Sequence, residues 1–143
     1  LTYKKMPFLR IAPICNGKIY VAPRSYQGEE PGKLDIPMED YIYACKTDTD
    51  KYAKEVENKY SNHITGQPEP RFSLKHLVKE TNGVKKTIML YILPLNDEEQ
   101  IHFTGGKFVT PEEIEMNSAQ YSSFLKEEVD HLNIVAQMWE EFK

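Results

Sequence analysis

Short apolar runs separated by polar turns make up much of the chain and predict β-strands. The clearest pair flanks Asn16-Gly17, because both residues of such a tight turn must accept positive φ, which Asn and Gly do readily. A later run, 88–93, is continuously apolar and predicts a central strand covered on both faces. The stretches predicted to be extended are 8–15, 18–24, 34–43 (one or two short strands), 72–80, 84–95 and 101–109 (a strand pair or one bulged strand).

Three other segments show helical spacing or helix-capping patterns. Apolar positions recur with the helical period in 48–61, for which Thr47 or Asp48 is the expected cap. A short helix is expected after Thr110, because Pro follows at the first helical position and two acids lie near the positive end of the helix dipole. A long helix is predicted for 118–142, with a buried stripe of Tyr121, Leu125, Val129, Leu132, Ala136 and Trp139.

The order of these elements predicts an α+β fold. Strands and helices alternate, with hairpins between them, so we expect a mixed β-sheet with helices on both faces, an α/β/α sandwich. At 143 residues, without repeats or linkers, the chain is expected to form one domain, 1–143.

Composition narrows the classes of function. The net charge of −4 argues against non-specific nucleic-acid binding, which needs a basic field. No apolar run approaches the roughly 20 residues that span a bilayer, so no membrane partner is expected. The two cysteines, Cys15 and Cys45, are interpreted as reduced, buried thiols of a cytoplasmic protein. The four histidines lack ligand spacing, which argues against a zinc site.

Four segments, in order, resemble the Nudix hydrolases (MutT-like proteins). Residues 16–25 resemble the first hairpin of that family, and Gly32-Lys33-Leu34-Asp35-Ile36-Pro37 resembles its Gly-Lys-Trp-Asp-Leu-Pro run. Residues 40–61 resemble the Nudix box, Gly-x5-Glu-x7-Arg-Glu-apolar-x-Glu-Glu-x-Gly, and 107–114 resemble the segment after the last strands. The resemblance implies a Nudix fold over most of the chain and a pyrophosphohydrolase acting on nucleoside diphosphates linked to another moiety.

The box itself departs from the family pattern at its metal-binding end. Laid on the box without gaps, Glu55 takes the place of the Glu in the Arg-Glu pair, whereas Asn58 and Lys59 replace the Glu-Glu pair. The other box places fall on Asp40 (Gly), Lys46 (first Glu), Lys54 (Arg), Val56 (apolar) and Ser61 (last Gly). Mg²⁺ or Mn²⁺, which the resemblance implies, needs clustered anionic oxygens, and one acid beside an amide and an ammonium is a poor set. We therefore predict that metal-dependent hydrolysis is weak or lost.

Two sets of candidate site residues follow from this comparison. Glu55 is the remnant of the catalytic carboxylates and the one candidate metal ligand, and Glu39 is a second carboxylate at the start of the box loop. The basic candidates for binding a small phosphorylated ligand without metal are Arg24, Lys33, Lys54 and Lys59. The alternatives left open are a weak hydrolase, a non-catalytic nucleotide- or phosphate-binding module that uses the same cleft, and a structural or partner-binding protein. Association into a homodimer is a further possibility.

Overall fold

The structure of the chain is a computed structural model, which describes residues 8–41, 49–79, 83 and 85–143. The strands are β1 (Phe8–Cys15), β2 (Lys18–Pro23), β3 (Leu34–Asp35), β4 (Met38–Tyr41), β5 (Arg71–Lys79), β6 (Lys85–Pro94) and β7 (Lys107–Val109). The α-helices are α1 (Thr49–Lys59), α2 (Pro111–Met116) and α3 (Ser123–Phe142). Short 3-10 helices are η1 (Ser61–His63), η2 (Glu98–Gln100) and η3 (Ser118–Gln120).

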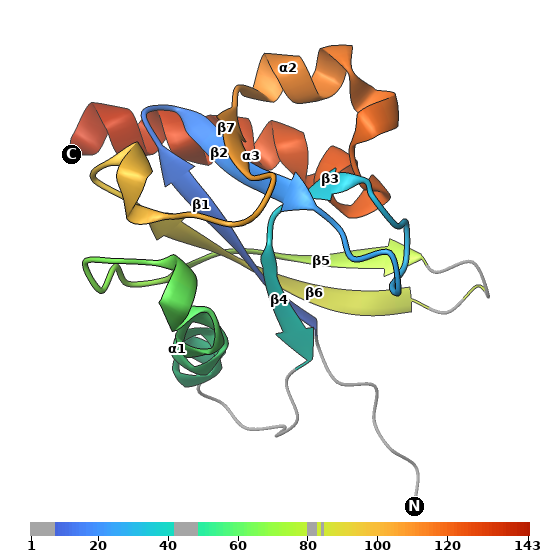
Figure 1. Cartoon of the computed structure of the whole chain (residues 1–143), viewed down its shortest axis with the longest axis horizontal. Coiled ribbons are helices and arrows are strands. Elements are labelled where there is room, and N and C mark those ends of the chain that lie inside the picture. The colour runs from blue at the N-terminus through green and yellow to red at the C-terminus, as the bar shows by residue number, and fades with distance from the viewer. Residues whose placement is uncertain (1–7, 42–48, 80–82, 84) are drawn as a thin grey trace, which may run out of the picture.

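The strands form one mixed sheet in the order β3-β2-β1-β6-β5 (Figure 1). β1 runs parallel to β6 and antiparallel to both β2 and β4, while β7 pairs with β2 and β5 with β6. Along one side of β1 the neighbour changes from β4, at Ile11, to β2, at Ile14. Pro13, which has no N–H to donate, lies in that change-over rather than at a strand end or sheet edge. The predicted mixed sheet and α+β class are confirmed.

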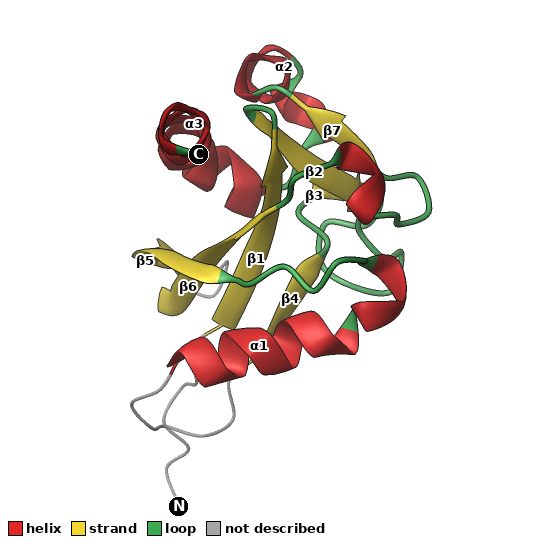
Figure 2. Cartoon of the chain, turned by 90° about the vertical axis from the view of Figure 1, so that its left-hand side faces the viewer, coloured by secondary structure: helices red, strands yellow, loops and turns green. Residues whose placement is uncertain are grey.

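Helices cover both faces of this sheet (Figure 2). α1 lies on one side, where Met89, Tyr91 and Leu93 of β6 join Ala53 and Val56 in one core. α2 and α3 lie on the other side, where the alternating residues of β6 pack against α3 in a second core containing Leu90, Ile92, Tyr121, Leu125, Val129 and Leu132. The prediction of a central strand covered on both faces is confirmed for β6.

Several element boundaries agree with the sequence analysis. Asn16 and Gly17 form the β1–β2 turn with φ of 54° and 75°. Thr110 caps α2, its side chain accepting a hydrogen bond from Glu113 N, with Pro at the helix start. The predicted caps of α1, Thr47 and Asp48, lie outside the described residues.

Two predicted elements were wrong in extent. Of 101–109, only β7 is a strand, because Gly105, at a φ of 73°, belongs to the turn that precedes it. The long helix begins at Ser123, not at residue 118. Tyr121 is extended and bridges Leu34, and Ser122 caps α3 by accepting a hydrogen bond from Leu125 N at 3.1 Å.

Among the described residues, no helix is both long enough and apolar enough to cross a bilayer.

Candidate functional site

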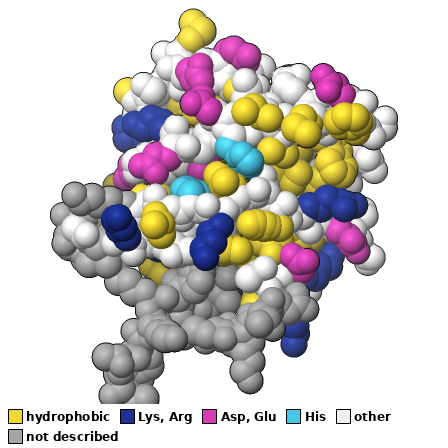
Figure 3. Space-filling model, turned by 180° about the vertical axis from the view of Figure 1, so that it is seen from behind, with side chains coloured by type: hydrophobic (Ala, Val, Ile, Leu, Met, Phe, Trp, Pro, Cys, Tyr) yellow, Lys and Arg dark blue, Asp and Glu magenta, His cyan; other side chains and the backbone are white. Residues whose placement is uncertain are grey.

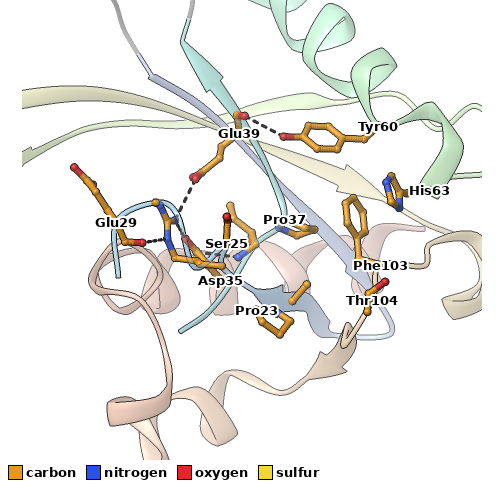
Figure 4. A pocket seen from close by; sticks show the side chains of 14 residues that line it. Pro23, Ser25, Glu29, Asp35, Pro37, Glu39, Tyr60, His63, Phe103 and Thr104 are labelled. Atoms are coloured by element: carbon orange, nitrogen blue, oxygen red, sulfur yellow. Dashed lines mark hydrogen bonds and ion pairs between the residues drawn. The ribbon is translucent and has the colours of Figure 1, made fainter. Parts of the chain in front are cut away.

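A cavity of about 510 Å³ opens beside the ends of β2 and β4 (Figure 4). Its walls come from segments far apart in sequence: the end of β2 with the loop that follows it, the chain from Asp35 of β3 to Glu39 of β4, the residues just after α1, and the loop before β7. Figure 4 shows charged side chains on one side and the rings of Tyr60, His63 and Phe103 on the other. The cavity therefore joins an ionic wall to an aromatic wall.

The ionic wall consists of arginines and carboxylates bound to one another. Arg24 Nη1 lies 2.5 Å from Asp35 Oδ2 and 3.1 Å from Glu39 Oε1. Arg10, which is fully buried in β1, donates to Asp35 at 2.7 and 3.1 Å and to Glu39 at 2.6 Å. β1, β3 and β4 thus hold the two acids between two guanidiniums.

A third carboxylate lies behind this wall. Glu128 of α3 is fully buried and accepts from Arg10 Nε and Nη2, the shortest of these contacts being 2.7 Å. His76 Nε2 of β5 lies 3.0 Å from Glu128 Oε2. The network therefore contains two arginines and three carboxylates, and it ties α3 to the sheet through charged groups in the core.

Burial and charge act in opposite directions on the pKa values of these acids. Burial alone would raise the pKa of Asp35, but the guanidiniums of Arg10 and Arg24 outweigh it and hold that pKa below the usual aspartate value. For Glu39 burial is the larger effect and, together with the negative charge of Asp35, raises the pKa. Asp35 is therefore the firmly ionised member of the pair.

The aromatic wall is fixed by stacking and by hydrogen bonds. The His63 and Phe103 rings are nearly parallel, at 7°, with centroids 4.0 Å apart. The ring centroid of Tyr60 lies 5.8 Å from that of Phe103, and the Tyr60 hydroxyl donates to the carbonyl of Glu39 at 3.2 Å. Such half-buried rings, already held in place, offer a flat surface on which a planar ligand can stack.

The structure brings together two of the predicted site residues. Glu39 and Arg24 both line the cavity, although each already binds an oppositely charged group of the protein. Lys33 Nζ donates to the carbonyl of Ala119, away from the cavity lining. The roles assigned to these residues remain predictions.

The predicted residues of α1 lie elsewhere. Lys54 Nζ pairs with Glu57 at 3.2 Å, one turn along the helix. Lys59 binds the Asp40 carboxylate, and Glu55 is exposed. None of the three is among the residues that line the cavity.

The donor set on α1 does not fit a divalent cation. Mg²⁺ and Mn²⁺ need several clustered anionic oxygens, but the box positions present the exposed Glu55 one helical turn before the ammonium of Lys59, which Asp40 already binds. In the part of the chain that the structure describes, no three His, Cys, Asp or Glu side chains are grouped so that they could hold a metal ion. Lys46, which takes the place of the first Glu of the box, lies outside the described residues.

Sequence reasoning missed several residues of the site. Tyr60 was counted only among the apolar positions of the predicted helix 48–61, and Arg10, Glu128, His63 and Phe103 were given no role. Two signals were present: Arg10 stands inside an apolar strand, and Glu128 stands three residues after Leu125 and four before Leu132, on the α3 stripe. A charge in such a position needs a buried partner, which these two residues provide for each other.

Two other cavities are lined differently. One of about 330 Å³, at the end of α3, is apolar and lined by Val135, Met138, Trp139, Phe142 and Lys143. The other, of about 630 Å³, lies between α1 and the start of β5. Figure 3 shows that apolar side chains gather on the rear face, with basic and acidic groups between them. The 630 Å³ cavity is lined mostly by charged side chains, including that of the predicted binding residue Lys54, and Phe72 is the one ring among the described residues of its lining.

The fold is that of the Nudix hydrolases. A Nudix hydrolase from Nitrosomonas europaea superposes with a TM-score of 0.63 at 11% identity, over 93% of this chain and 91% of that one. The Ap4A hydrolase of Caenorhabditis elegans gives 0.60 at 15% identity, over 94% and 99%. A protein of Deinococcus radiodurans gives 0.66 at 16% identity, over 92% and 85%.

The resemblance of the four sequence segments is too weak for whole-sequence comparisons to detect. No protein-family model matches the chain, and no curated protein matches it. The likeness to Nudix hydrolases is therefore a likeness of fold alone.

Proposed function

We propose that this chain is a divergent Nudix-fold protein that binds a nucleoside-containing ligand in the cavity and hydrolyses it with Mg²⁺ weakly or not at all. The proposal is supported mainly by the positions and partners of the charged side chains. The acids of the cavity, Asp35 and Glu39, are bound to arginines, and the box position Lys59 carries an ammonium bound to Asp40. Carboxylates held in this way are poor ligands for a hard cation, whereas the cavity and its rings can accommodate a nucleoside.

A calorimetric titration with Mg²⁺ and Mn²⁺ tests the metal part of the proposal. We expect no saturable binding at millimolar metal, and the same heats for the natural protein and for Glu55→Gln. Saturable binding that Glu55→Gln abolishes would defeat the proposal. A screen of nucleoside diphosphate-linked compounds, read by phosphate release after phosphatase treatment, tests turnover directly.

A gain-of-binding variant tests the alignment of the box. Asn58→Glu combined with Lys59→Glu would restore the family's carboxylates beside Glu55, three acids that a helix presents within about one turn. We expect this variant to bind Mn²⁺ measurably in the same calorimeter. The matched control is Gln120→Glu with Lys107→Glu, which likewise replaces one neutral and one basic side chain by Glu, at exposed positions outside α1, and is expected to bind no metal.

A further inference from the structure

We propose that the cavity recognises the nucleoside part of its ligand and is indifferent to the phosphates, so that a nucleoside binds as tightly as its 5′-diphosphate. This inference rests on the proposed function, and it concerns which chemical part of the ligand is recognised. It differs from the phosphate-binding role first assigned to the basic residues.

The charges around the cavity carry the inference. Among the described residues that line it, Arg24 is the one Lys or Arg side chain. Its Nη1 is bound to Asp35 and Glu39, and its Nε donates to the carbonyl of Glu29 at 2.8 Å. A phosphate that approached Arg24 would have to displace these acids or lie beside them.

The second guanidinium does not alter this balance. Arg10 is fully buried behind the wall, where it binds Asp35, Glu39 and Glu128. Two positive groups thus face three negative ones, and the network has no surplus positive charge with which to attract a phosphate. The other basic candidates, Lys33, Lys54 and Lys59, are bound outside the cavity lining.

The aromatic wall offers contacts that do not depend on the phosphates of a ligand. Phe103 and His63 are stacked, and Tyr60 is anchored to the backbone of Glu39, so the rings are ordered before any ligand arrives. Stacking on such rings suits the planar face of any nucleobase and needs no charge on the ligand. Ser25 and Thr104 also line the cavity and are exposed, and their hydroxyls can bond to a sugar or to a base edge.

The test compares four nucleosides (adenosine, guanosine, cytidine and uridine) with their 5′-diphosphates by calorimetry, without metal. For the nucleoside that binds, we expect its diphosphate to bind with an affinity within about fivefold. A diphosphate that binds more than about fivefold tighter overturns the inference but leaves the proposed function standing. If no nucleoside and no diphosphate binds, the proposed function fails and the inference with it.

Two variants test the two walls separately. Phe103→Leu keeps an apolar side chain but removes the ring, and it is expected to weaken nucleoside and diphosphate alike by about tenfold. The matched control, Phe108→Leu, removes a ring that contacts Tyr20 and does not line the cavity, and it should leave both affinities nearly unchanged. Equal losses from both variants would contradict stacking on Phe103.

Glu39→Gln changes the charge balance instead. It removes one of the carboxylates that Arg24 and Arg10 bind, so the two arginines are less fully neutralised. The diphosphate should then bind this variant with an affinity at least about fivefold higher than that of the nucleoside. A folded Glu39→Gln protein that still treats the two ligands equally would show that these acids do not control phosphate recognition. Circular dichroism establishes that the variant is folded.

Discussion

Replacing Arg10 by Met is expected to be among the most destabilising single changes in this protein. The guanidinium is fully buried and all its nitrogens donate to Asp35, Glu39 or Glu128, the single Nε–H being shared between the two Glu128 oxygens. Met fits the space of the side chain but leaves Asp35 and Glu128, both 1% exposed or less, without this partner. Removing one partner of a buried ionic network typically costs about 3–5 kcal/mol. In a domain of this size such a loss lowers Tm by about 10 °C or more.

Urea unfolding followed by circular dichroism measures this loss. Arg71→Met is the matched control, since Arg71 is exposed and its guanidinium lies over the Trp139 ring at 5.4 Å. We expect the free energy of unfolding of this control to fall by less than about 1 kcal/mol. Arg10→Met combined with Glu128→Met should recover much of the stability, because replacing a buried pair by apolar side chains is often close to neutral. If Arg10→Met costs no more than Arg71→Met, the buried network contributes little and the reasoning is refuted.

Two further predictions concern the surroundings of the cavity. Gly106→Ala should destabilise the protein by about 1–3 kcal/mol in the same unfolding assay, because a Cβ there would meet the Tyr20 hydroxyl at 2.0 Å. Gly28→Ala, whose nearest contact would be at 3.9 Å, is the control and should be close to neutral. The lowered pKa of Asp35 predicts stability that is fully present above about pH 4, the unfolded value, and is lost as pH falls through the folded value. Asp35→Asn should remove the loss of stability at low pH that Asp35 causes. Glu39, whose pKa is raised in the folded protein, acts in the opposite direction, because its protonation at low pH favours the folded state.

The sequence predicts those elements whose determinants are local. The β1–β2 turn follows from Asn16-Gly17, because few other residues accept positive φ, and α2 follows from Thr110 and the proline after it. The continuous apolar run in β6 similarly predicts a strand between two helical layers. The start of α3 was placed too early because Tyr121 fits the helical stripe, yet its backbone pairs with Leu34, a contact that depends on tertiary structure.

The candidate site was less accessible to sequence reasoning because its contacts are long-range. Arg10 and Glu128 are 118 residues apart, and no local pattern associates them. The resemblance to the Nudix box directed attention to α1, where spacing alone shows which residues share a face. It could not show that Lys59 binds Asp40 or that Tyr60, the next residue, lines the cavity. Both facts depend on how α1 packs beside β4.

The buried network also bears on how rigid the cavity is. Glu39 and Asp35 are held by Arg10, which α3 fixes through Glu128, so the ionic wall is anchored in the core rather than in a surface loop. The aromatic wall is joined to β4, the strand that carries Glu39, by the hydrogen bond from the Tyr60 hydroxyl to the Glu39 carbonyl. A site that is ordered before the ligand arrives loses little conformational entropy on binding. A ligand bound as proposed would meet a preformed surface, and the arginines that bind Asp35 and Glu39 occupy oxygens that a hydrolytic metal would need.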